Sequence, residues 1–201
     1  MRHQQGVTFG AIVWITALVM AGCVAQPPAV EEAAGHAPNL NLPPESLGRS
    51  LSLSQIVTGT YGDRTRSMRF EVEIENESNK LVVVALSHFG GTLFILRQED
   101  KKVLVEAYTD ELDGIDPSWV LFDLQVTYWP GERLERALSK QRMRLEDEPK
   151  SGVRRVFGSR EELIMEVRYL DGFLVPGDIT IDHFDRPYRL LIDALEPGEN
   201  S

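Results

Sequence analysis

The sequence predicts a mainly β protein with some α-helix, in which a strongly curved antiparallel sheet of about ten strands is covered by helices on its concave face. Apolar and polar residues alternate through most of the chain after Leu47, which is the period of strands with one buried side. Short clusters of Gly, Asn, Asp and Pro separate these segments, as in hairpins. One stretch near residues 116–138 changes to the period of a helix and contains two of the three tryptophans.

The clearest strand is the segment RSMRFEVEIE at residues 66–75. One of its faces carries Met68, Phe70, Val72 and Ile74. Its other face is charged, so only one side of this strand is expected to be buried. Similar patterns predict strands at 53–58, 80–87, 92–98, 102–108, 142–147, 153–158, 162–170, 178–184 and 187–195.

The helical stretch begins at Asp116, a residue type that favours the N-cap, followed by Pro117 at the first helical position. Large side chains then recur at spacings of three, four and three residues, which places on one stripe Trp119, Phe122, Val126 and Trp129. Pro130 ends this helix, and leucines four residues apart at 134 and 138 predict a second, shorter one. We expect both helices to pack on the concave face of the sheet, because a curved apolar sheet needs a cover there.

Residues 1–22 have the order of a secretory signal peptide: Arg2 near the start, an uncharged apolar run, and then the small residues Ala21 and Gly22. The apolar run is shorter than the roughly 20 residues that span a bilayer. Cys23, the single cysteine of the chain, follows directly, and this pattern resembles the lipobox of bacterial lipoproteins. The resemblance implies cleavage before Cys23 and lipidation of its thiol. The alternative is an ordinary signal peptide with an incidental cysteine.

The residue after the cysteine, Val24, is not the Asp that retains lipoproteins in the inner membrane under the enterobacterial sorting rule. We therefore expect the protein at the periplasmic face of the outer membrane, held by its lipid. Residues 23–46 are expected to form the lipidated cysteine and an extended, proline-rich tether. The folded domain is expected over 47–196, with a disordered tail at 197–201.

The chain is acidic, with 31 Asp and Glu against 21 Lys and Arg, which does not favour binding to nucleic acid or to an anionic lipid surface. Its four histidines are scattered without a cysteine partner, so no metal site is expected. His183 is expected at the surface of an edge strand, and the acidic run at 110–116 in a solvated loop. Without a nucleophile motif or a phosphate-binding loop, we expect no enzyme, and no cofactor other than the covalent lipid on Cys23.

Three segments resemble a known family: residues 42–75, residues 81–96 and, most specifically, LFDLQVTYWP at 121–130. They are similar to the DUF3261-type domain of bacterial envelope lipoproteins, a relative of the outer-membrane lipoprotein receptor in the LolA/LolB-like superfamily. The resemblance covers roughly residues 42–195. It implies an unclosed half β-barrel of about 10–11 strands, plugged by helices, whose interior holds acyl chains.

The resemblance also implies where such a cavity lies. Its wall would be formed by Met68, Phe70, Val72 and Ile74, and its lid by Trp119, Phe122, Val126 and Trp129.

The loop SHFGG at 87–91 has a counterpart in the receptor family, where a bulky apolar residue followed by Gly protrudes and helps to insert cargo into the bilayer. Phe89, Gly90 and Gly91 match this pattern, with Phe in place of the usual Leu and His88 in place of the usual Pro. The residues alone fit equally a simple hairpin in which Phe89 folds back on the sheet.

Two functions remain. In the first, the protein is a carrier or receptor for a hydrophobic, acyl-bearing cargo, such as a lipoprotein or a polyene lipid, received from a periplasmic carrier protein. In the second, it is a structural accessory of an envelope assembly or export system, with its interior filled by its own side chains. The resemblance favours the first.

Overall fold

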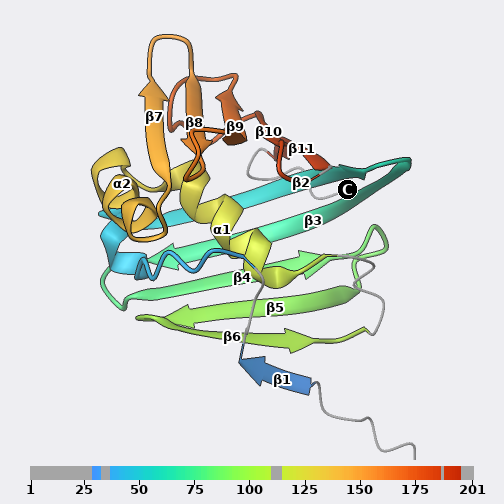
Figure 1. The fold of residues 1–201 in the computed structure, drawn as a ribbon. Helices are drawn as coiled ribbons and strands as arrows, with labels where there is room; N and C mark the ends of the chain where they lie inside the picture. The colour runs from blue at the N-terminus through green and yellow to red at the C-terminus, as the bar shows by residue number, and fades with distance from the viewer. Residues whose placement is uncertain (1–28, 33–36, 110–114, 187, 196–201) are drawn as a thin grey trace, which may run out of the picture.

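The computed structural model describes residues 29–32, 37–109, 115–186 and 188–195, and in it one antiparallel sheet curves around a helix (Figure 1). The strands found in these residues are β1 (Ala29–Glu32), β2 (Leu51–Tyr61), β3 (Arg64–Glu75), β4 (Lys80–Leu86), β5 (Thr92–Glu99), β6 (Lys102–Ala107), β7 (Arg144–Glu148), β8 (Val153–Phe157), β9 (Leu163–Tyr169), β10 (Ile179–His183) and β11 (Tyr188–Ala194). The predicted fold class, an open, mainly β sheet with a helical cover, is confirmed. The predicted signal peptide, Cys23 and the C-terminal tail lie outside the described residues.

The sheet is made of two meanders that meet in its middle. Strands β2 to β6 follow one another outward to one edge, where β1 pairs with β6. Strands β7 to β11 run inward from the opposite edge until β11 pairs with β2. The chain between β6 and β7 therefore crosses from one edge of the sheet to the other. The helices α1 (Pro117–Tyr128) and α2 (Gly131–Lys140) lie in this crossing, and Figure 1 shows α1 across the concave face.

Helix α1 begins and ends where the sequence predicts. The carboxylate of Asp116 accepts a hydrogen bond from the backbone N–H of Ser118 (2.9 Å), and Pro117 occupies the first turn. At the other end the backbone of Trp129 is extended, and Pro130 is the N-cap of α2, which begins at the next residue.

Among the described residues no helix is long and apolar enough to cross a membrane.

The core lies between the concave face and α1. The predicted alternation in β3 is confirmed, because its four apolar residues are all buried: Met68, Phe70, Val72 and Ile74. Strands β4 and β5 add to the same face Leu81, Val83, Ala85, Phe94 and Leu96. The rings of Phe70 and Phe94 meet edge to face, with centroids 6.1 Å apart, so β3 and β5 pack together across β4.

The folded part of the chain starts earlier than predicted. The N-terminal segment (residues 37–47) packs on α1 and ends in a short 3-10 helix, η1 (Pro44–Leu47), although the prolines of this region predicted a free tether. Leu40 and Leu42 are buried, and the carbonyl of Leu42 accepts hydrogen bonds from Gln98 (2.8 Å) and Gln125 (3.0 Å). The physical reason is that α1 is apolar on its outer side as well, so it needs a second cover.

Candidate ligand-binding cavity

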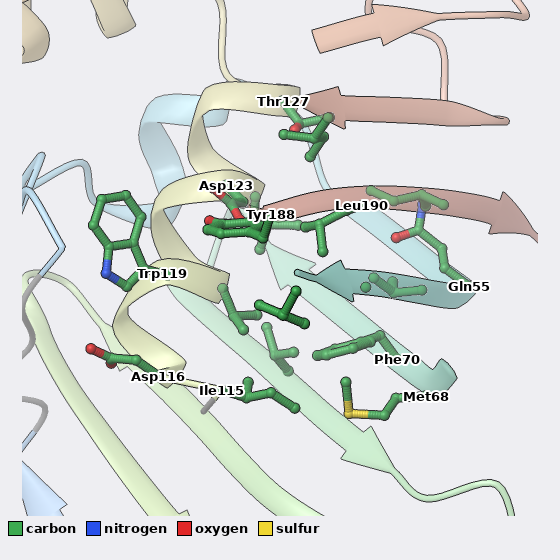
Figure 2. Close-up of a pocket in the computed structure, with 18 of the residues that line it drawn as sticks. Gln55, Met68, Phe70, Ile115, Asp116, Trp119, Asp123, Thr127, Tyr188 and Leu190 are labelled. Carbon is green, nitrogen blue, oxygen red and sulfur yellow. The ribbon is translucent and has the colours of Figure 1, made fainter. Parts of the chain in front are cut away.

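A cavity of about 680 Å³ lies between α1 and the concave face of the sheet (Figure 2). Its walls come from α1, β2, β3, β4, β10 and β11 and are mainly apolar, with side chains that include Val57, Met68, Phe70, Leu124 and Leu190. The volume is within the range of roughly 300–1,000 Å³ that is typical of small-molecule sites. The interior is therefore not filled by the protein's own side chains.

The cavity is elongated along α1 and β2. It is lined on β2 by alternate residues from Gln55 to Tyr61, and along α1 by residues from its N-cap, Asp116, to Tyr128. These spans correspond to about 20 Å of strand and about 18 Å of helix. A site of this length suits a chain-like molecule.

The two ends of the cavity differ in exposure. Beside the N-terminus of α1, Trp119 and Arg186 are half-buried and Asp185 is exposed. At the opposite end three polar side chains are almost completely buried, with exposed fractions of 3% for Gln55, 1% for Thr127 and 2% for Tyr128. The cavity is therefore open beside the N-terminus of α1 and closed beside its C-terminus.

Aromatic rings form a row at the open end. The guanidinium of Arg186 lies 3.8 Å from the centroid of the Trp119 ring. Trp119 meets the ring of His183 edge to face at 5.7 Å, His183 stacks on Tyr188 at 4.1 Å, and Tyr188 stacks on Tyr61 at 5.3 Å. These contacts connect α1, β10, β11 and β2 around the opening.

Asp123 fixes the middle of α1 to the sheet. Its carboxylate accepts a hydrogen bond from the hydroxyl of Tyr188 (3.1 Å) and lies 2.9 Å from Nε2 of His183. Burial, and then the negative charge of Asp123, raise the pKa of the Tyr188 hydroxyl well above its ordinary value, so this residue stays a neutral donor. The prediction that His183 lies at the surface is wrong. It is 7% exposed, because β10 is an interior strand and this side chain faces α1, where it contacts Trp119 and Asp123.

The closed end is held by polar contacts to the last turn of α1. Arg154, which is completely buried, donates to the carbonyls of Val126 (2.6 Å) and Trp129 (2.9 Å) and forms a two-pronged ion pair with Asp147 (2.7 and 2.8 Å). The hydroxyl of Tyr169 donates to the carbonyl of Thr127 (2.6 Å). Carbonyls that a helix leaves without partners at its C-terminus are satisfied here by side chains of β8 and β9.

Residues 52–196 match the family described as "Protein of unknown function (DUF3261)". This chain belongs to the DUF3261 family. No curated protein matches it in sequence.

Two solved structures are similar to this DUF3261 chain. A DUF1329 family protein from Desulfovibrio piger gives a TM-score of 0.46 at 8% identity, covering 78% of this chain and 89% of that one. A putative outer membrane lipoprotein-sorting protein domain from Vibrio parahaemolyticus gives a TM-score of 0.39 at 7% identity, covering 72% and 83%.

The predicted wall and lid of the DUF3261 cavity are only partly the observed ones. Met68, Phe70 and Val72 line it, while Ile74 lies in the core beyond it. Of the predicted stripe on α1, only Trp119 lines the cavity. The others are buried elsewhere: Phe122, Val126 and Trp129. The reason is that α1 is covered on both sides, and the indole of Trp129 donates to Ser46 of the N-terminal segment (2.8 Å).

Sequence reasoning missed the polar residues of the site. Asp123 and Thr127 lie inside a helix that is predicted from its apolar stripe, and Gln55 stands in β2 at a position where the alternation predicts an apolar side chain. Polar residues at positions of apolar periodicity were the available signal.

The described residues contain no group of His, Cys, Asp and Glu that could hold a metal ion.

Phe89 stands at the tip of the β4–β5 loop and is 96% exposed. Gly90 has a φ of +81°, and the loop is closed by hydrogen bonds from Ser87 N–H to Gly91 O (2.8 Å) and from Gly90 N–H to Ser87 O (2.9 Å). The alternative in which Phe89 folds back on the sheet is wrong, because the closed loop directs the ring into solvent.

Proposed function

We propose that this protein is a carrier or receptor for a hydrophobic, chain-like cargo, such as an acyl-bearing lipid or lipoprotein, at the outer membrane. The observation that carries the proposal is the elongated apolar cavity of about 680 Å³ between α1 and the sheet, open at one end. An apolar chain that enters it exchanges water for apolar walls, which contributes about 25 cal/mol per Å² of buried surface.

The open end also carries exposed aromatic side chains. Antiparallel pairing places the end of β2, the end of β4, the end of β6 and the start of β11 at the same rim of the sheet. Phe89 (96% exposed), Phe184 (56%) and Tyr108 (47%) stand in or beside the loops of this rim. Figure 1 shows the β2–β3 and β4–β5 turns on the same side of the molecule. Aromatic side chains in this position favour contact with a lipid interface, so the cargo leaves where the protein meets the membrane.

In this proposal the lipidated Cys23 holds the domain at the periplasmic face of the outer membrane, a periplasmic carrier protein delivers the cargo, and the protein itself catalyses no reaction. Two or more hydrophobic signals are needed for a stable anchor. The rim alone therefore orients a domain that its lipid already holds.

The cavity is tested by filling it. Val57 faces the cavity from β2, whereas its neighbour Ile56 points to the other side of the sheet. We expect Val57→Phe to lower the affinity for a fluorescent fatty acid by at least tenfold, and Ile56→Phe to leave it unchanged. Melting temperatures of both variants show that each is folded.

Equal binding by wild type and Val57→Phe would contradict the proposal. So would the absence of acyl species in mass spectra of lipids extracted from the gently purified protein, combined with a failure to bind the fluorescent probe. That pair of results would favour the structural accessory instead.

A further inference from the structure

Gln55 is a buried amide that makes one hydrogen bond among the described residues. Its Nε2 donates to the hydroxyl of Tyr128 (2.7 Å), and no described residue pairs with its other amide atom. The side chain is 3% exposed and lines the closed end of the cavity, and Figure 2 shows the amide pointing from β2 into that space. Gln55 pairs across the sheet with Phe70, which lines the same cavity together with Val72, Leu124 and other apolar side chains.

The second amide atom of Gln55 faces the cavity, and no described residue packs over it. A glutamine side chain offers two donors and an acceptor with two lone pairs, so most of its hydrogen-bonding capacity is directed at the cavity. A leucine or methionine at this position would continue the alternation of β2 and leave the inner wall apolar. The placement of Gln55 therefore points to a polar group that occupies the inner end of the cavity when a ligand is bound.

The charge around the closed end restricts that group to an uncharged one. Arg186 is the cation among the described lining residues, and it stands at the open end. Arg154, near the closed end, is already engaged by Asp147 and by two carbonyls of α1. A carboxylate at the inner end would be a buried charge without a partner, which is strongly unfavourable.

We propose that the cavity takes a long apolar chain with a hydroxyl group at its inner end, and that Gln55 is the residue that recognises this hydroxyl. A hydroxyl both donates and accepts, so it pairs with whichever amide atom of Gln55 faces the cavity. The distance from the opening to Gln55, about 20 Å along β2, sets the length of the chain. This inference rests on the proposed function and names the chemical class of its ligand.

The test compares two ligands that differ only in this group. ω-Hydroxypalmitic acid and palmitic acid each displace a fluorescent fatty acid from the wild type, from Gln55→Met and from Gln55→Leu. We expect the wild type to prefer the hydroxylated acid by about tenfold, the equivalent of about 1.4 kcal/mol. Both variants should lose this preference while they keep or improve their affinity for palmitic acid.

The ratio of the two affinities is measured within one protein, so a partial loss of stability does not imitate the result. Gln98→Met is the matched control, because Gln98 is an equally buried glutamine whose amide donates to the carbonyls of Leu42 and Asp100 outside the cavity. This variant should keep the preference for the hydroxylated acid.

Equal affinities for the two acids in the wild type, or a preference that survives in both Gln55 variants, would overturn the inference and leave the proposed function standing. If neither acid displaces the probe from any of the proteins, the proposed function itself fails, and the inference fails with it.

Discussion

Oδ1 of Asp123 in α1 lies 2.9 Å from Nε2 of His183 in β10, and both side chains are buried beside the cavity. The second carboxylate oxygen accepts a hydrogen bond from the hydroxyl of Tyr188 in β11 (3.1 Å). One side chain of the helix thus satisfies two buried groups of the sheet, and it fixes the distance between the two walls of the cavity.

Replacing Asp123 by Ala leaves the imidazole of His183 and the hydroxyl of Tyr188 without their partner. We expect Asp123→Ala to lower the free energy of unfolding in urea by about 2–5 kcal/mol, because buried polar groups would lose their hydrogen bonds. Asp185→Ala, at an exposed carboxylate 3.8 Å from Nδ1 of His183, should change it by less than about 1 kcal/mol. Similar effects of the two substitutions would contradict the role of Asp123.

Alkaline pH should destabilise the fold through its buried tyrosines. Burial raises the pKa of Tyr128 to about 12, above its value in the unfolded chain near 10. The neutral form is therefore favoured by folding. This contribution is fully present below pH 10 and is lost as the pH rises from about 10 to about 12. In urea titrations at pH 8, 10 and 11, Tyr128→Phe should show a smaller alkaline loss of stability than the wild type. An equal loss would show that Tyr128 does not contribute.

Thr127→Val should stabilise the protein by about 1 kcal/mol. The Thr127 hydroxyl is buried and has no hydrogen-bond partner among the described residues, and valine has nearly the same shape. The melting temperature measures the change. Thr58→Val is the control, since the Thr58 hydroxyl is hydrogen-bonded to Ser67 (2.7 Å) and its removal brings no such gain. A lower melting temperature for Thr127→Val would mean that its hydroxyl is satisfied.

Phe89→Glu should leave the melting temperature unchanged, because the ring is 96% exposed. Insertion of this ring into a lipid interface contributes about 1.5–3 kcal/mol, so we expect the variant to lose cargo transfer to liposomes while the acylated protein stays in the membrane fraction. Transfer at the wild-type rate would remove Phe89 from the mechanism.

Cys23→Ala should yield a folded protein that no longer fractionates with membranes. Cys23 is the residue where the sequence predicts acylation, and it precedes β1, the first described strand, which begins at Ala29. Fractionation of cell envelopes followed by circular dichroism of the soluble variant measures both properties. A variant that remains in the membrane fraction would place the anchor elsewhere.

Much of the fold was predictable because one-sided burial leaves a period of two in the sequence. The face of β3 from Met68 to Ile74 and the cap of α1 at Asp116 were both predicted from local pattern. The exposed position of Phe89 was one of two readings that the loop allowed.

The rest depends on contacts between distant segments. Whether Trp129 faces the cavity is decided by Ser46, more than eighty residues earlier in the chain. His183 is buried because side chains of α1 and β11 pack on it, and the sequence of β10 alone does not reveal these neighbours. The local period predicts which side chains are buried, but it does not predict which segment packs on them.

The pairing of β2 with β11 has a consequence for how the chain folds. Tyr61 pairs with Tyr188, so the middle of the sheet is completed only when the last strand of the chain arrives. Ordering a pairing between segments so far apart costs loop entropy before it gains contacts, which slows folding. A chain that emerges N-terminus first would display the open edge of β2 until β11 has been synthesised, and this unpaired edge is a template for aggregation. Truncation before Tyr188 would leave the backbone edges of β2 and β10 permanently unpaired.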